Sequence, residues 1–312
     1  MKLASHNKTL AVWLAALVLG GTALSATSDP VYRASVEKWR ADREAHLKAD
    51  DGWLAVAGLF WLHEGENRFG SDPLNDIVLP ARSSPAEAGS FDFHGGTTLV
   101  HVKAGVPVTV LGKRVETARL RADSDPAFNG NSDQITLGDL TLYVHASGDR
   151  YAVRLLDKNS PLRRQFTGLR WFPVDPAYRV VASYVPYEKS KTVQVQNIMG
   201  DFTPTTIPGY VAFKLNGQDL RLDVEMDASE ISITFRDLTS GKETYGAARF
   251  LVAEAPKDGN GKVILDFNEA YNPPCAYNPY TTCPLPTPEN RLRARIAAGE
   301  MAYHGQPHPA AH

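Results

Sequence analysis

The chain has 312 residues, a formal net charge of −2 at pH 7 and two cysteines. No block of five or six like charges occurs outside the mixed segment 38–51, so nucleic acid is excluded as an expected partner. This length is enough for one large β-rich domain or for two small ones.

Residues 1–26 have the features of a secretory signal peptide. Lys2 and Lys8 precede the apolar run 10–21, and small residues follow it. A spanning helix needs about 20 apolar residues, so this run is short for a membrane anchor. We expect cleavage after Ser25 or Ala26, a periplasmic or secreted mature protein, and no stable membrane anchor after cleavage.

An amphipathic helix is expected to open the mature chain, within residues 27–52. Asp29 is a plausible N-cap and Pro30 suits the first helical position. Good helix formers then continue to about Ala49, after which Asp50, Asp51 and Gly52 end the helix.

After the helix, the pattern changes to short strands separated by Gly, Pro, Asn and Asp. The expected strands are 53–62, 75–80, 97–102, 106–111, 139–146, 151–157, 179–185, 192–199, 210–215, 220–226, 231–237, 249–253, 262–267 and 291–298. Such a series predicts a mainly β fold, a sandwich or barrel, and not a parallel α/β sheet. In 291–298, Leu292, Ala294 and Ile296 alternate with three arginines, whose face we expect to be solvated.

Residues 65–156 contain phrases in the order of a forkhead-associated β-sandwich. They are GENRFGSDPLNDIVLP, VLGKRV and SDQITLGDLTLYVH, and the resemblance is topological. Domains of that type bind phosphothreonine through an arginine after a glycine and through a serine and a histidine. Here Gly70 is followed by Ser71, and Ser83, Ser84 and His94 do not have the motif's spacing, so we do not expect phosphopeptide binding.

Further phrases extend over nearly all of the mature chain. Residues 52–80, 166–180, 235–251, 263–290 and 290–300 together resemble the bacterial and archaeal family of unknown function DUF1684. The resemblance implies no transferable activity. It does imply that FRDLTSGKETYG and DFNEAYNPPCAYNPYTTCPLP are features of the family. The expected organisation is a signal peptide (1–26), a helix (27–52), a forkhead-associated-like sandwich (53–157), a second β-rich unit (158–300) and a flexible tail (301–312).

The C-terminal loop, which we define as residues 266–300, is rich in proline and asparagine and holds both cysteines. Proline lowers the entropy of the unfolded loop, so the loop is expected to be rigid. Cys275 and Cys283 enclose seven residues. They are candidates for a disulfide, with buried free thiols as the alternative, because no C-x-x-C motif or nearby histidine indicates a metal site.

Polar and aromatic side chains of this segment are the candidates for a ligand site. The candidates for ligand binding are Arg236, Tyr245, Arg249, Asp266, Asn268, Tyr271, Asn272, Tyr280 and Asn290. In the alternative interpretation, Asp266, Asn268 and Asn290 bond to loop backbone groups and an arginine pairs with Asp266.

Catalytic motifs are missing from the sequence: there is no G-x-S-x-G, H-E-x-x-H or Walker A pattern. Asp266 with Glu269 or Glu300 could act as an acid and base pair, and His63 is a further candidate, although a lone histidine is commonly an ordinary residue. We expect no cofactor and no metal. Three hypotheses stay open: a protein that binds a small polar ligand at the C-terminal loop, a cell-envelope hydrolase of carbohydrate or ester, and a structural envelope protein.

Overall fold

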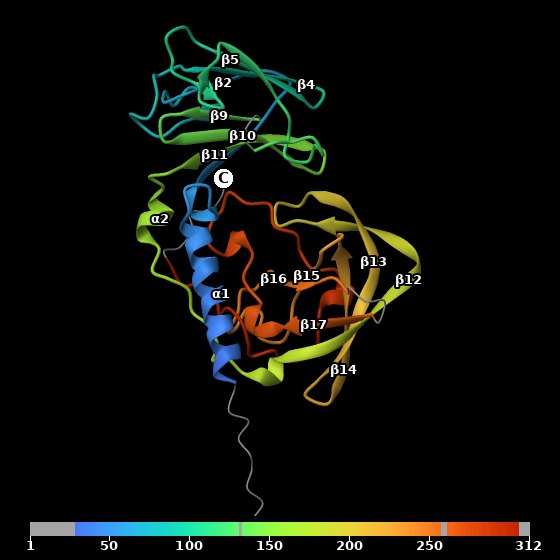
Figure 1. Cartoon of the computed structure of the whole chain (residues 1–312). Helices are drawn as coiled ribbons and strands as arrows, with labels where there is room; N and C mark the ends of the chain where they lie inside the picture. Colours follow the sequence, from blue (N-terminus) through green and yellow to red (C-terminus); the bar gives the residue numbers. More distant parts are fainter. Residues whose placement is uncertain (1–28, 131–132, 257–260, 306–312) are drawn as a thin grey trace, which may run out of the picture.

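Figure 1 shows the computed structural model of the chain, which describes residues 29–130, 133–256 and 261–305. The fold is mainly β, with one long helix at its start and several antiparallel sheets, as the strand pattern predicted. The signal peptide predicted for residues 1–26 lies outside the described residues. None of the described helices is both long and apolar enough to cross a membrane.

Helix α1 (Pro30–Lys48) begins at the predicted N-cap. The Asp29 carboxylate accepts a hydrogen bond from the Val31 amide at 2.9 Å, and Pro30 occupies the first turn, where its missing N–H costs nothing. The helix buries Val36 and Leu47 and lies along the C-terminal unit (Figure 1). It therefore brings side chains from the start of the chain next to the C-terminal loop.

Two sheets form the N-terminal unit and enclose one hydrophobic core. One sheet has the order β1-β11-β10-β9-β6-β7 and the other β3-β2-β4-β5-β8. Phe69, Phe91 and Val100 from one sheet pack with Leu142 and Val153 from the other, which is a sandwich. The elements are η1 (Trp53–Ala55), β1 (Val56–Trp61), β2 (Gly65–Gly70), β3 (Ile77–Val78), β4 (Gly89–His94), β5 (Thr97–Val102), β6 (Thr109–Val110), β7 (Lys113–Arg114), β8 (Thr117–Leu120), β9 (Gln134–Leu137), β10 (Leu140–Ser147) and β11 (Arg150–Asp157).

The C-terminal unit is built on one curled sheet with the order β16-β15-β14-β13-β12-β17. The predicted strands 179–185 and 192–199 are largely parts of one strand, β12, which has a register shift between Pro186 and Lys191. The elements are α2 (Pro161–Gln165), η2 (Pro176–Tyr178), β12 (Arg179–Gln196), β13 (Phe202–Leu215), β14 (Gln218–Met226), β15 (Glu230–Phe235), β16 (Arg249–Glu254), β17 (Lys262–Asp266), η3 (Phe267–Glu269), η4 (Pro274–Ala276) and η5 (Pro288–Asn290).

The two units have separate main hydrophobic cores, and both apolar and polar contacts join them. In a smaller apolar cluster, Val56 and Leu156 of the sandwich pack with Tyr280 of the C-terminal loop. Phe213, Phe235 and Phe267 belong to the core of the C-terminal unit, and none of the core residues of the sandwich is part of it. Between the units, the Arg150 guanidinium pairs with the Asp201 carboxylate at 2.8 Å. The junction therefore brings residues of β10 and β11 next to the C-terminal loop.

The strand predicted at 291–298 is wrong, although its alternation is confirmed. Leu292, Ala294 and Ile296 are buried and the arginines between them are exposed. The backbone of this segment pairs at scattered points with residues 236–238, for example Leu292 N–H to Arg236 O at 2.8 Å, so no regular ladder forms. Extended backbone with one buried face produces the same sequence pattern as a strand.

The tail expected to be flexible from residue 301 starts with ordered residues. The Met301 amide donates to Arg170 O at 2.8 Å, and the Ala302 amide donates to Glu243 O at 2.9 Å. The Tyr303 ring packs on Phe166 and Tyr277. Aromatic burial thus fixes residues 301–303, while residues 306–312 lie outside the described part of the chain.

Candidate functional site

A groove of about 640 Å³ lies between α1 and the edge strands of the curled sheet. Its lining combines carboxylates, cations and aromatic rings from five parts of the chain. The lining residues are Tyr32, Ser35, Trp39, Arg179, Glu230, Val252, Ala253, Glu254, Ala255, Lys262, Val263, Ile264, Asp266 and Glu269. Concave sites with a few convergent polar groups are where small ligands bind.

Asp266 stands at the end of β17, where its carboxylate is held from several sides. The Tyr32 hydroxyl donates to Asp266 Oδ2 at 2.8 Å, and the Asn268 amide N–H donates to Oδ1 at 3.0 Å, which caps η3. Arg179 Nε lies 3.6 Å from Oδ2. The arginine partner that the sequence predicted for Asp266 is therefore Arg179, and the carboxylate is fixed in one orientation.

Glu269 differs from Asp266 because it lines the same groove without a partner. Among the described residues, no hydrogen bond or ion pair reaches its carboxyl group, which is half-buried. Burial, and after it the neighbouring Asp266 charge, raises the pKa of Glu269 to about 7. At neutral pH this carboxyl group is thus divided between its protonated and ionised forms, next to the fixed Asp266 carboxylate.

Most of the other predicted ligand residues satisfy the backbone of the C-terminal unit instead of lining the groove. The Asn268 side chain is buried and bonds to the Tyr32 hydroxyl and to the backbone of Asp175. The Asn290 side chain accepts from the Asp223 amide at 2.8 Å and donates to Asp223 O and Thr234 O. Buried backbone groups of irregular segments need such partners, so these asparagines serve the architecture.

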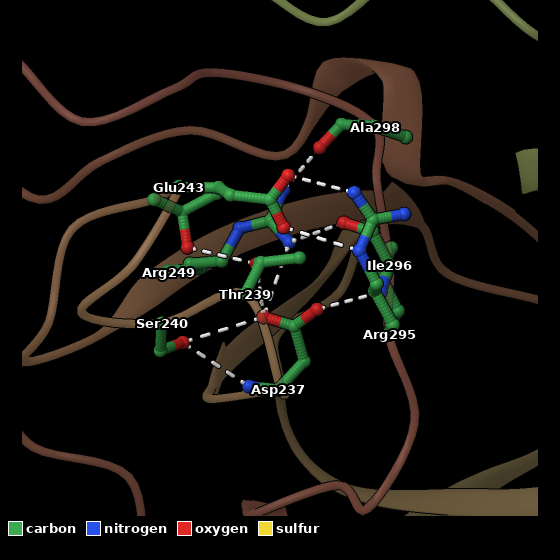
Figure 2. A network of polar contacts seen from close by, with 9 residues as sticks. Asp237, Thr239, Ser240, Glu243, Arg249, Arg295, Ile296 and Ala298 are labelled. Carbon is green, nitrogen blue, oxygen red and sulfur yellow. Dashed lines mark hydrogen bonds and ion pairs between the residues drawn. The ribbon is translucent and has the colours of Figure 1, made fainter.

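Arg249 is fully buried, and its contacts also hold segments of the fold together. Figure 2 shows its guanidinium between Asp237 and the carbonyls of Ile296 and Ala298. The Arg249–Asp237 ion pair measures 3.4 Å, and Asp237 also accepts from the Ile296 amide at 2.7 Å. Burial lowers the pKa of Arg249. Its contacts cross-link β16 to the closing segment of the chain and leave it outside the groove.

Glu300 and Asn272 form a second buried polar group, under α1. Glu300 accepts hydrogen bonds from the Asn272 amide N–H at 3.1 Å, from Asn272 Nδ2 at 2.9 Å and from the Tyr277 hydroxyl. Arg43 of α1 pairs with Glu300 at 3.3 Å and stacks 4.0 Å above the Tyr271 ring. Burial raises the pKa of Glu300. The predicted pair of Asp266 and Glu300 therefore does not share the groove.

The remaining candidates also lie elsewhere. The Arg236 amide bonds to Asn290 O at 3.0 Å, and the Tyr280 amide bonds to Asn278 Oδ1 at 2.8 Å. His63 belongs to the N-terminal unit, where its exposed ring lies 3.5 Å from the Asp76 carboxylate. That position fits an ordinary surface histidine.

The two cysteines are close together and are free thiols in this structure. The Cys275 amide donates to Cys283 Sγ at 3.1 Å, and the Tyr245 hydroxyl donates to Cys275 O at 3.3 Å. Of the two alternatives left open by the sequence, this state is the buried thiol pair. Among the described residues, no group of three or more His, Cys, Asp or Glu side chains is arranged to hold a metal ion.

Sequence reasoning missed the groove residues contributed by α1 and β12. Tyr32, Ser35 and Trp39 have the spacing i, i+3 and i+7, which places them on one face of the helix. This spacing was visible in the sequence. What the sequence lacked was the position of that face against β17, more than 200 residues away along the chain.

Comparison with known proteins agrees with the family resemblance. The family model described as "Protein of unknown function (DUF1684)" matches residues 164–301. The chain belongs to the DUF1684 family. Among solved structures, it is similar to an uncharacterised protein of Haloarcula marismortui, gene locus rrnAC0354, with 31% identity over 45% of this chain and 78% of that chain and a TM-score of 0.37. No curated protein matches the chain. The likeness of residues 65–156 to a forkhead-associated sandwich stays a prediction.

Proposed function

We propose that this DUF1684 protein binds a small polar ligand in the groove between α1 and β17. The observation that supports the proposal is the half-buried Glu269 carboxyl group, which faces a groove of about 640 Å³ and has no hydrogen-bond or ion-pair partner among the described residues. Partial burial disfavours the charged form of this carboxyl group, and a ligand that carries hydroxyl or amine groups supplies the donor that the described residues do not. Arg179 and Lys262 in the same lining can donate to the acceptor atoms of such a ligand.

A thermal-shift screen of the chain from Thr27 tests this proposal. The panel contains sugars, polyols, amines, organic acids, phosphates and nucleotides. A ligand at 100 times its dissociation constant stabilises the folded state by about 2.7 kcal/mol. The shift should disappear in Glu269→Gln and Asp266→Asn and persist in Glu289→Gln, because Glu289 is an exposed glutamate of the same loop, in η5. A panel in which no compound shifts the wild type, or shifts it without dependence on Glu269, refutes the proposal.

A second candidate is a hydrolase for carbohydrate or ester substrates that uses the same two carboxyl groups. The observation in its favour is that Glu269 lines the groove together with the Asp266 carboxylate, which Tyr32 and Arg179 hold. Burial raises the pKa of Glu269 to about 7. A protonated acid beside an ionised carboxylate is the pairing that general acid catalysis of glycoside hydrolysis requires. Turnover of nitrophenyl glycosides with an alkaline limb near pH 7 that is lost in Glu269→Gln supports it. Binding without turnover rejects it and leaves the ligand-binding proposal intact.

Export to the periplasm or medium is a separate proposal, supported by the charge and hydropathy of residues 1–26. N-terminal sequencing of the protein from a periplasmic extract should give a start after Ser25 or Ala26. In such an oxidising compartment, we further propose that Cys275 and Cys283 form a disulfide. Mass spectrometry of the alkylated protein without reductant distinguishes the disulfide from the two thiols.

A further inference from the structure

A hydrogen-bonded chain of three side chains joins the two units at a distance from the groove. His145 of β10 bonds through Nδ1 to Asp123 Oδ2 at 2.7 Å and through Nε2 to Thr282 Oγ1 at 2.9 Å. Asp123 and His145 belong to the sandwich, whereas Thr282 belongs to the C-terminal loop. The Asp123 carboxylate is fixed further by the Ala146 amide, which donates to Oδ1 at 3.0 Å.

The partners of His145 determine the direction of its hydrogen bonds. An ionised carboxylate only accepts hydrogen bonds, so Nδ1 carries the proton that binds Asp123. In the neutral ring, Nε2 then has a lone pair and accepts from the Thr282 hydroxyl. This is the order of groups in which a carboxylate orients an imidazole and the imidazole takes a proton from a hydroxyl nucleophile.

Arg154 adds unused hydrogen-bond donors to the same cluster. Its side chain is 3% exposed, and its Nε and Nη2 have no hydrogen-bond partner within the described part of the chain. Its Nη1 donates to the Tyr143 hydroxyl at 3.1 Å and lies 3.8 Å from Asp123 Oδ2. Arg154 therefore adds a buried positive charge, with two nitrogens unpaired among the described residues, next to the Asp123 carboxylate.

The cluster is within reach of solvent. Asp123 and Tyr143 line a hollow of about 590 Å³, together with Phe128, Leu156 and Lys158. Thr282 itself is partly exposed, in contrast to Thr281 beside it, which is 1% exposed. The hollow borders the cluster through Asp123, whereas Thr282 does not line it and reaches solvent through its own partly exposed surface.

We propose that Asp123, His145 and Thr282 form a second, catalytic site that hydrolyses small carboxylic esters, with Thr282 as nucleophile, His145 as general base and Asp123 as the positioning residue. Thr282 Oγ1 bonds to the ester carbonyl carbon while its proton passes to His145 Nε2. The tetrahedral intermediate expels the alcohol, which takes the proton from His145, and an acyl-threonine is left. Water then attacks the acyl carbon, gives its proton to His145, and releases the acid as Thr282 recovers its proton.

The test measures hydrolysis of p-nitrophenyl acetate by the chain from Thr27, together with the mass of its peptides after brief reaction. We expect p-nitrophenol release above the buffer rate and an acetyl adduct on the peptide that contains Thr282. Thr282→Val should lose both, with a fall in kcat/KM of at least about a hundredfold. Thr281→Val is the matched control: it removes a hydroxyl that donates to Asn278 O at 3.1 Å and does not contact His145, so it should keep both.

Asp123→Asn gives an independent variant in case the Thr282 substitution disturbs the loop. The amide keeps the size of the carboxylate but no longer selects the Nδ1 tautomer, so hydrolysis should fall while far-UV circular dichroism stays unchanged. Hydrolysis at the buffer rate by the folded wild type overturns the proposal, as does an adduct on another residue or equal rates in Thr282→Val. In those cases the three side chains act as a structural bridge between the units. Glu289→Gln, at an exposed position in η5, should keep this activity. The acetyl adduct on the Thr282 peptide assigns the hydrolysis to this site, so failure here is distinct from failure at the groove.

Discussion

Replacement of Glu269 by glutamine should change the pH dependence of stability. In the folded protein, burial raises the pKa of Glu269 from its ordinary value of 4.5 to about 7. The group therefore binds a proton more tightly in the folded state than in the unfolded state. Its contribution to stability is fully present below pH 4.5 and is lost as the pH rises through 7.

The size of the effect follows from the two pKa values. Each pKa unit corresponds to 1.36 kcal/mol, so the full difference sets an upper limit of about 3 kcal/mol. Because Glu269 is only half-buried, solvent screening reduces this, and we expect about 1–2 kcal/mol. For a chain of this size, that free energy corresponds to roughly 2–8 °C in Tm.

Thermal unfolding of wild type and Glu269→Gln between pH 4 and 8 measures the effect. The two proteins should have similar Tm values at pH 4, and the variant should be the more stable at pH 8, because the amide never ionises. Glu289→Gln, at an exposed site of the same loop, should follow the wild type throughout. Parallel curves for wild type and Glu269→Gln would show that the carboxyl group is solvated in solution and that its pKa is not raised by folding.

Three further substitutions test the architectural contacts by urea denaturation. Arg249→Met should destabilise by about 3–5 kcal/mol because it leaves the buried Asp237 charge unpaired, and adding Asp237→Asn should recover part of the loss. Asn290→Ala should cost about 2–3 kcal/mol, since three backbone groups lose their partner. Tyr32→Phe should lower the free energy of unfolding by about 1–2 kcal/mol, because the Asp266 carboxylate and the Asn268 side-chain amide lose their hydrogen bonds to the hydroxyl. Unchanged urea midpoints in the three variants would refute these roles.

The fold class was readable because local patterns determine it. Helix α1 has both a cap and a proline at its start, and thirteen of the fourteen predicted strands overlap observed ones. The pattern failed at 291–298, where alternating burial comes from packing against residues 236–238 and not from a strand partner. It also missed β2 and β4, whose glycines and polar residues hide strands that pair well in three dimensions. Pairing partners are a tertiary property that one strand's sequence does not contain.

The site was less predictable because the same residue types serve two purposes in the C-terminal loop. Asn268, Asn272 and Asn290 were candidates for ligand binding on composition, and all three are buried against backbone groups. Asp266 was identified from the loop, but Tyr32 and Arg179, which fix it, come from distant parts of the chain. The chain Asp123–His145–Thr282 likewise joins residues more than 130 positions apart, at no spacing that a motif describes.

Glu269 and Glu300 of the C-terminal loop differ in whether hydrogen bonds from the chain reach their carboxyl groups. Glu300 and Glu269 are both glutamates of the loop whose pKa is raised by burial. Glu300 has hydrogen bonds from Arg43, Asn272 and Tyr277, so its buried carboxyl group is accounted for by the fold. Glu269 has no such contacts among the described residues, although it is half-buried and borders open space. This contrast between the two carboxyl groups is the reason why we propose Glu269, and not Glu300, as a contact of the ligand.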